Sequence, residues 1–184
     1  MSNTFPGTTV EVSRLKKGSS KALFGGIFAT GGITLSQVSI MTGLEPYLIQ
    51  NWVKRGFVPS PVKRLYSEEQ FARIIIINML KEALQIERIC SLIRVIGGVL
   101  EDTTDDLISD AELYHRYVDM LADESINVTD PASVRNAAVA AASDFVERIP
   151  NTRKKLERIF EVMLYAHAAA QFRASAEQML STIK

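Results

Sequence analysis

Six residues between positions 50 and 64 are amides or cations, which are types that contact DNA. Gln50 and Asn51 are neighbours, and an amide side chain can donate to and accept from the edge of one adenine. Basic residues that can bind phosphate oxygens follow soon after: Lys54, Arg55, Lys63 and Arg64. An isolated lysine or arginine is usually a solvated surface residue, and this alternative stays open for each of them. Their clustering beside two amides favours a nucleic-acid surface.

A pair of short helices is needed to hold these side chains. Thr34 and Gln37 have the spacing of a capping box, which predicts that a helix begins there. Gly43 can end that helix in a left-handed conformation, and Pro46 suits the first position of a second helix. The second helix should close at Gly56. Together the two helices make a helix-turn-helix pattern.

The second helix has an apolar face and a polar face. Apolar residues that recur at helical spacing should mostly pack inward, with Trp52 in the core: Leu48, Ile49, Trp52 and Val53. The opposite face should be exposed, and it carries Tyr47, Gln50, Asn51 and Lys54.

A short hairpin and two more helices are expected next. The sequence Pro-Ser-Pro at residues 59–61 excludes a helix, and residues 62–66 can form a short strand of a wing. A second capping box starts at Ser67 and predicts a helix over residues 67–83. Helical spacing of apolar residues predicts another helix over residues 85–96.

Two stretches carry a family resemblance, ITLSQVSIMTGLEPYLIQNWVKRGF and VKRLYSEEQFARIIIINMLKEALQIERICSLI. They resemble the winged helix-turn-helix of mercury-resistance-type (MerR-like) regulators, and most closely a group of uncharacterised bacterial MerR-like proteins. The resemblance implies that Arg64 is the wing arginine and Tyr66 the wing tyrosine. Gln50 and Asn51 depart from it, because better-known relatives have an Arg-Tyr pair there. This departure implies altered specificity, weaker DNA binding, or a helix used for protein contact.

We therefore expect a mainly α-helical protein, with a winged helix-turn-helix of MerR-like type before a C-terminal helical region. The predicted parts are a partly irregular N-terminal arm (1–32), the winged helix-turn-helix (33–98), an acidic linker (99–108) and a helical dimerisation or effector region (109–184). Helices in the last region are expected at residues 109–122, 131–149 and 152–183. The last of these is long and has an apolar face, which makes it the candidate for joining two copies.

Charge is unevenly distributed along the chain, although its net charge is zero. Residues 1–97 carry twelve Lys and Arg against six Asp and Glu, whereas residues 98–130 carry ten acidic residues and one arginine. A basic front and an acidic middle suggest different roles for the two parts.

Several classes of function are disfavoured. The polar N-terminus lacks the features of a signal peptide, and no apolar run approaches the ~20 residues of a membrane span, so we expect a cytoplasmic protein without a membrane partner. Cys90 stands alone on an apolar stripe and should be buried. His115 and His167 lack neighbours at ligand spacing, and each should be exposed or partly packed. No nucleophilic side chain has a general base at a suitable spacing, so we do not expect an enzyme. We also expect no bound metal and no cofactor.

The sequence predicts a homodimeric, sequence-specific DNA-binding regulator of transcription. Its partners would be double-stranded DNA, a second copy of the chain and, as a further possibility, a small-molecule effector. The alternative is a protein-interaction or small-ligand module that keeps the fold without binding DNA, which the zero net charge leaves open. The residues expected at the DNA are Tyr47, Gln50, Asn51, Lys54, Arg55, Lys63, Arg64 and Tyr66.

Overall fold

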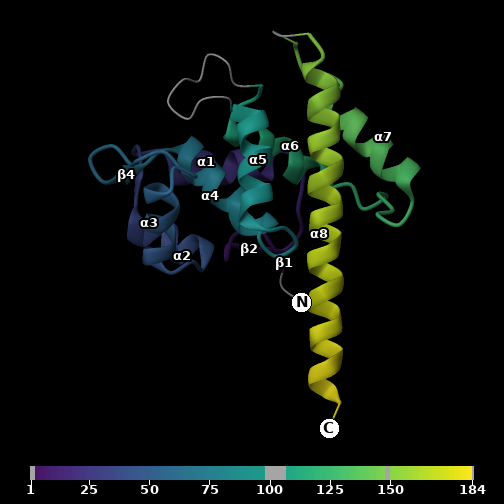
Figure 1. The fold of residues 1–184 in the computed structure, drawn as a ribbon, viewed down its shortest axis with the longest axis horizontal. Helices are drawn as coiled ribbons and strands as arrows, with labels where there is room; N and C mark the ends of the chain where they lie inside the picture. The colour runs from purple at the N-terminus through teal and green to yellow at the C-terminus, as the bar shows by residue number, and fades with distance from the viewer. Residues whose placement is uncertain (1–2, 98–106, 148–149, 184) are drawn as a thin grey trace.

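The chain is mainly α-helical in the computed structural model, as the sequence predicts (Figure 1). The structure describes residues 3–97, 107–147 and 150–183. Within these ranges the helices are α1 (Ser19–Ile27), α2 (Leu35–Thr42), α3 (Pro46–Lys54), α4 (Glu68–Leu80), α5 (Ile86–Gly97), α6 (Asp110–Leu121), α7 (Pro131–Ala142) and α8 (Thr152–Thr182). The strands are β1 (Asn3–Thr4), β2 (Glu11–Val12), β3 (Ile33–Thr34) and β4 (Leu65–Tyr66).

The N-terminal arm is more ordered than its glycines suggested. β1 pairs antiparallel with β2, and α1 forms although it contains two glycines. Phe24 of α1 is 1% exposed, and its ring centroid lies 5.5 Å from those of both Phe71 and Tyr114. This aromatic packing outweighs the low helix propensity of glycine, because propensity is a weak preference that tertiary contacts override.

Gly7 fixes the path of the arm across α4. Its φ is +73°, and a Cβ at this position would lie 2.3 Å from the carbonyl oxygen of Ile75. The Asn78 side chain donates to the Gly7 carbonyl at 2.9 Å, and the Tyr114 hydroxyl donates to that of Pro6 at 2.8 Å. The arm is therefore held by hydrogen bonds to two different helices.

Both predicted capping boxes are present. At α2 the Gln37 amide N–H donates to Thr34 Oγ1 at 3.3 Å, and the Thr34 N–H donates to Gln37 Oε1 at 2.8 Å. Ser67 and Gln70 make the equivalent pair of bonds at α4. Gly43 ends α2 with φ +69°, and Pro46 opens α3, as predicted.

α4 is the centre of the core. It was predicted to present a broad apolar surface, but nearly all of its side chains are buried, Ile74 to Ile77 among them. A helix that is apolar on all sides must be surrounded by other elements. The buried side chains that pack with it come from both sides of the predicted linker and form one cluster.

The predicted linker at residues 99–108 falls mostly on residues 98–106, which lie outside the described residues. Beyond it, α6 begins after its N-cap Ser109, and the Arg73 side chain of α4 donates to Asp110 Oδ2 at 2.7 Å. α7 starts at Pro131 behind the predicted N-cap Asp130, but ends earlier than expected, at Ala142.

α8 runs past the rest of the molecule, so that its C-terminal half projects from the body (Figure 1). Its first half packs against α7 and α4, with Leu156, Phe160 and Leu164 buried. Every side chain from Gln171 to Ile183 is exposed.

In the described parts of the chain, none of the helices combines the length and the apolar character that crossing a lipid bilayer demands.

Candidate nucleic-acid interface

Helix α3 faces outward with the polar side chains that were predicted to be exposed. Ile49 and Trp52 are buried, Trp52 at 3% exposure, which confirms its place in the core. The outward face carries Tyr47, Gln50, Asn51 and Lys54, all of them exposed. Two amides and a cation thus share one side of a short helix, with Tyr47 near its start.

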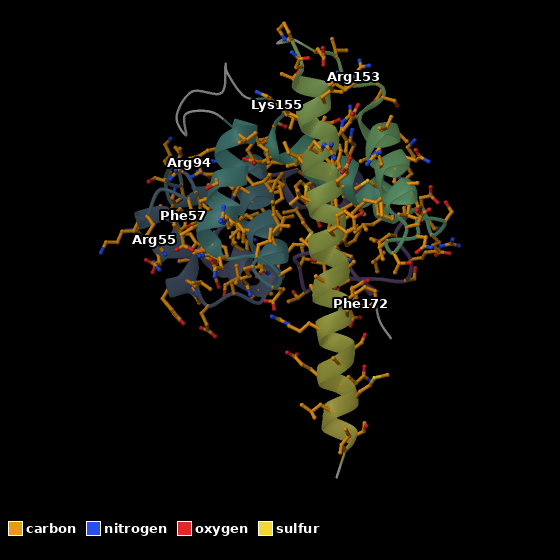
Figure 2. The ribbon with its side chains drawn as sticks, turned by 45° about the vertical axis from the view of Figure 1, so that its right-hand side comes forward. Arg55, Phe57, Arg94, Arg153, Lys155 and Phe172 are labelled. Carbon is orange, nitrogen blue, oxygen red and sulfur yellow. The ribbon has the colours of Figure 1, made fainter. Side chains whose placement is uncertain are left out.

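Arg55 directly follows α3, and two neighbours orient its side chain. Its guanidinium lies 4.5 Å from the ring centroid of Phe57 and 3.9 Å from Glu87 of α5. Figure 2 shows Arg55 and Phe57 at the edge of the molecule. The Arg55 side chain remains 47% exposed. A cation over an aromatic ring is held in place but stays accessible to an anion.

The hairpin tip is formed by Lys63 and Arg64. Val62 and Leu65 exchange two backbone hydrogen bonds, of 3.1 Å and 2.9 Å, so the loop between them has two residues. Both loop residues have positive φ, 51° for Lys63 and 65° for Arg64. Tight hairpins demand this conformation and usually supply it with Asn-Gly, because side chains with a Cβ adopt it at a cost. Two exposed cations therefore occupy strained positions.

The hairpin is anchored through β4, which pairs antiparallel with β3 just before α2. Sequence analysis predicted a strand over residues 62–66; only Leu65 and Tyr66 form it, with Val62 in an isolated bridge. Gly32 permits the close approach, since a Cβ there would lie 2.9 Å from the Tyr66 carbonyl oxygen. This pairing ties the hairpin to the start of the two-helix unit.

Tyr66 differs from the other predicted site residues because it is buried, at 3% exposure. Burial also raises the pKa of its hydroxyl. Its ring packs in the core, so it supports the hairpin from within. The seven other predicted residues are exposed.

Figure 1 places the hairpin that contains β4 and helix α3 at the same end of the molecule. Among the described residues, Glu87 is the one carboxylate within 4.0 Å of a basic nitrogen of Lys54, Arg55, Lys63 or Arg64. These cations are therefore neither buried nor covered by acidic side chains.

Arg94 of α5 is a further exposed cation, and it was not among the predicted site residues. Burial raises the pKa of Cys90, and the charges of Arg94 and Arg55 oppose this rise. Figure 2 shows Arg94 on the same side of the molecule as Arg55 and Phe57. Helical periodicity predicted that α5 is a core helix, but gave no indication that Arg94 lies on the same side of the molecule as Arg55. Cys90 is buried, as predicted.

A hollow of about 560 Å³ lies between α3 and the turn that joins α4 to α5. Its walls include the apolar residues Leu48, Leu84 and Ile86, and Asn51 and Arg55 also line it. Two of the predicted DNA contacts thus border a space that can receive a side chain or a small ligand.

His115 is buried at 5% exposure, so the prediction that it is exposed or partly packed was wrong. Ser20 Oγ lies 2.9 Å from its Nδ1, and Glu68 Oε1 lies 3.7 Å from its Nε2. A serine, a histidine and a carboxylate in a row resemble a catalytic arrangement, but Ser20 is fully buried. The trio joins α1, α6 and α4. Burial, with a smaller contribution from Lys21, lowers the pKa of His115.

The described residues contain no group of three or more His, Cys, Asp or Glu side chains placed to hold a metal ion.

The exposed side of α8 carries a second apolar face, which sequence analysis missed. Its side chains are all exposed and alternate at spacings of three and four residues, the last of them at the C-cap: Val162, Tyr165, Ala169, Phe172, Ala176, Met179 and Ile183. The apolar face that the sequence offered for joining two copies is mostly buried against the body instead, from Leu156 to Leu164. The regular seven-residue period was the signal that could have revealed the outward face. We call this row of seven residues the α8 seam.

Residues 34–117 match a protein family described as a domain of unknown function, DUF1836. The match begins at the N-cap of α2 and ends inside α6, so it includes both α3 and the hairpin. The uncharacterized protein YkrK of Bacillus subtilis (strain 168) is 24% identical over 164 residues, which are 82% of this chain and 70% of that protein. No solved structure matches the chain.

Neither match points to the MerR-like regulators. The family resemblance drawn from the sequence was therefore wrong. The quoted stretches contain capping boxes, a glycine turn and an amphipathic second helix, and these features specify local structure in unrelated proteins too.

Proposed function

We propose that this protein is a dimeric, sequence-specific DNA-binding regulator of transcription that acts in the cytoplasm. In this proposal α2 and α3 form a helix-turn-helix, and the hairpin from Phe57 to Tyr66 is its wing. The observation that carries the proposal is the pair of exposed cations, Lys63 and Arg64, in left-handed conformations at the hairpin tip.

Backbone strain supports a functional role for the tip. Residues held in unfavourable conformations cluster at binding sites, where the strain is retained because the side chains are needed. Asn-Gly would form this turn more easily than Lys-Arg. Since the side chains of Lys63 and Arg64 make no hydrogen bond or ion pair within the described residues, their charges are available to an external anion.

The face of α3 suits the major groove. Gln50 and Asn51 can each form two hydrogen bonds with an adenine, while Lys54 and Arg55 can bind the phosphates beside the groove. In a helix-turn-helix the second helix enters the groove, and a wing contacts the neighbouring backbone. The exposure of both elements at one end of the molecule agrees with this arrangement.

The α8 seam supports a dimer. Seven apolar residues at heptad spacing are the pattern by which two helices pack as a coiled coil. The large side chains of the seam are 41% to 74% exposed in the single chain, from Val162 to Ile183. A second copy would bury the same row of residues on both helices. Two DNA-binding units on a symmetric site would also raise affinity and set the half-site spacing.

DNA binding is tested by fluorescence anisotropy with the DNA upstream of the protein's own gene and with unrelated DNA of equal length. Arg64→Ala should weaken binding to both by a similar factor. Asn51→Ala should weaken binding to the specific site by about 1–3 kcal/mol and leave the unrelated DNA nearly unaffected. Arg135→Ala, at an exposed position of α7, is the matched control and should bind as the wild type does. An equal loss on both DNAs for Asn51→Ala would contradict its role in reading the sequence.

Dimerisation is tested by sedimentation equilibrium at micromolar concentration. Phe172→Asp places a charge in the middle of the α8 seam and should give a monomer. Val146→Asp is the control, because Val146 is 79% exposed but lies outside the seam. A wild-type protein that is monomeric throughout this range would overturn the dimer.

A module that binds protein or a small ligand is the second candidate, favoured by the hollow beside Asn51 and Arg55. Lack of retention on heparin, together with no gel shift on genomic DNA fragments, would favour this alternative.

A further inference from the structure

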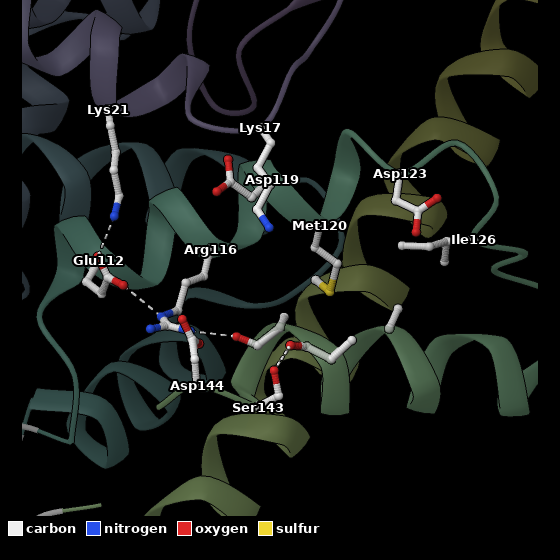
Figure 3. Close-up of a pocket in the computed structure, with 13 residues that line it drawn as sticks. Lys17, Lys21, Glu112, Arg116, Asp119, Met120, Asp123, Ile126, Ser143 and Asp144 are labelled. Atoms are coloured by element: carbon white, nitrogen blue, oxygen red, sulfur yellow. Dashed lines mark hydrogen bonds and ion pairs between the residues drawn. The ribbon is translucent and has the colours of Figure 1, made fainter. Parts of the chain in front are cut away.

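A cavity of about 580 Å³ lies between α6 and α7, beside the segment that leads into α1. Small-molecule sites in proteins usually have about 300–1,000 Å³, so the cavity is of the size of a ligand site. Figure 3 shows its lining side chains converging from these three parts of the chain. It lies apart from the face of α3 and from the α8 seam, and none of their residues lines it.

One part of the lining is apolar. Met120 and Ile126 contribute the large side chains, and α7 contributes Ala137, Ala140 and Ala141. The short alanine side chains leave open the space between the two helices. An aliphatic group of a ligand could fill it and would be removed from water.

At one end of the cavity the charges neutralise one another. Arg116 donates to Glu112, to Asp144 and to the Ala141 carbonyl, and Lys21 lies 3.3 Å from Glu112. Burial by itself would lower the pKa of Arg116, but the hydrogen bonds and charges of Asp144 and Glu112 outweigh it and raise the pKa. This network is fixed and has little remaining capacity for a ligand.

Three other charged groups line the cavity without such a network. Asp119 accepts from the Gly18 amide with one carboxylate oxygen, at 2.7 Å, and Asp123 accepts from Ser125 with one oxygen. Lys17 has no carboxylate oxygen within 4.0 Å among the described residues, and it makes no side-chain hydrogen bond there. The cavity thus offers both signs of charge to a ligand.

The position of the two aspartates favours a cationic group. α6 ends at Leu121, so Asp119 lies in its last turn and Asp123 just beyond it. Negative side chains are unfavourable at the C-terminal end of a helix, where the dipole is also negative. Asp119 already has Lys17 beside it in Figure 3, whereas an ammonium group of a ligand could offset the charge of Asp123.

We propose that this cavity binds a small aliphatic amino acid. Its ammonium group would contact Asp123, its carboxylate would contact Lys17, and its side chain would lie against Met120, Ile126 and the alanines of α7. Binding at this cavity does not depend on whether the protein binds DNA.

The first test is a thermal-shift screen of the full chain with the aliphatic amino acids, followed by calorimetric titration with L-leucine. Two matched probes lack one charge each: 3-methylbutylamine has no carboxylate, and 4-methylpentanoate has no amine. We expect L-leucine or another aliphatic amino acid to bind, and each single-charge analogue of it to bind at least about tenfold more weakly. No binding by any aliphatic amino acid, or equal binding by an amine that lacks the carboxylate, would overturn the proposal.

Two variants assign the two ends of the ligand. Asp123→Asn should weaken amino-acid binding about tenfold or more and leave the carboxylate probe unaffected, while Lys17→Met should do the same and spare the amine probe. Glu124→Gln and Lys16→Met are the neighbouring controls, because neither residue lines the cavity. The thermal midpoint of each variant without ligand shows that it is folded. Wild-type affinity in both Asp123→Asn and Lys17→Met would exclude this site.

Discussion

At the scale of single residues, two cations at a tight turn would set stability against the proposed DNA binding. Lys63 and Arg64 both adopt positive φ, which costs a residue with a Cβ about 1–2 kcal/mol. The double variant Lys63→Asn/Arg64→Gly should therefore have a free energy of unfolding about 1–2 kcal/mol higher than that of the wild type. Urea denaturation measures this difference. The same variant should bind DNA more weakly.

Lys54→Asn serves as the control for this pair, since it removes an exposed cation of α3 without changing the hairpin. It should weaken DNA binding without a gain in stability. A double hairpin variant that is less stable than the wild type would contradict the strain that we assign to the turn.

The buried imidazole of His115 makes stability depend on pH. Burial lowers its pKa below the ordinary value of 6.5, so the folded state holds this proton less strongly than the unfolded chain does. The free energy of unfolding should be highest above pH 6.5 and should fall as the pH is lowered through and below this value. Denaturation curves from pH 8 to pH 5.5 measure the effect.

His115→Gln removes this titration, so its stability should vary less with pH than that of the wild type. Burial lowers the pKa of His167 too, so His167→Gln should also reduce the dependence of stability on pH and serves as a comparison. A slope that is unchanged in His115→Gln would assign the pH dependence to other groups.

At the scale of elements, a buried ion pair connects α4 to α6. Arg73 and Asp110 have side-chain exposures of 7% and 8%, with Arg73 Nε 2.7 Å from Asp110 Oδ2. Removing one member leaves the other charge buried, so Arg73→Met should lower the free energy of unfolding by about 3–5 kcal/mol. Thermal or urea denaturation provides the measurement.

The double variant Arg73→Met/Asp110→Asn tests the origin of that loss. It removes both charges and should recover part of the stability that Arg73→Met loses. Additive losses in the two single variants and the double variant would mean that the ion pair itself contributes nothing.

Local signals predicted the elements that local chemistry determines. Thr34, Ser67 and Asp130 cap their helices as expected, and Gly43 ends α2, because each acts on backbone groups a few residues away. α1 was missed because its stability comes from the packing of Phe24 against α4 and α6. The pairing of β3 with β4 was missed for the same reason, since strand partners distant in sequence leave no local pattern.

The candidate interface was predictable to a similar degree. The outward face of α3 follows from helical periodicity, and its four predicted side chains are exposed. The burial of Tyr66 and the left-handed conformation of the tip depend on the hairpin turn and on the pairing of β4 with β3. The spacing of residues in the sequence does not predict either of them. Arg94 and the cavity between α6 and α7 depend on the relative placement of whole helices.

At the scale of the whole molecule, the proposed dimer would bring eight basic side chains to the DNA, four from each copy. Each phosphate contact releases bound counterions, so the logarithm of the affinity should fall with the logarithm of salt concentration with a slope of about −7. Arg64→Ala should make the slope less steep by about 2, because it removes one contact in each copy. A slope near zero would show that these cations do not bind phosphates.

In the proposed dimer, the projecting half of α8 would make secondary structure depend on protein concentration. The side chains from Gln171 to Ile183 are exposed, and Arg173 joins this stretch to Glu82 of the body by an ion pair. Most of the stability of a helix in a protein comes from tertiary packing, and this stretch has little of it in the single chain. On dilution below the dissociation constant this stretch should therefore unwind. Circular dichroism would then register the separation of the two copies as a loss of helical signal, while the body stays folded.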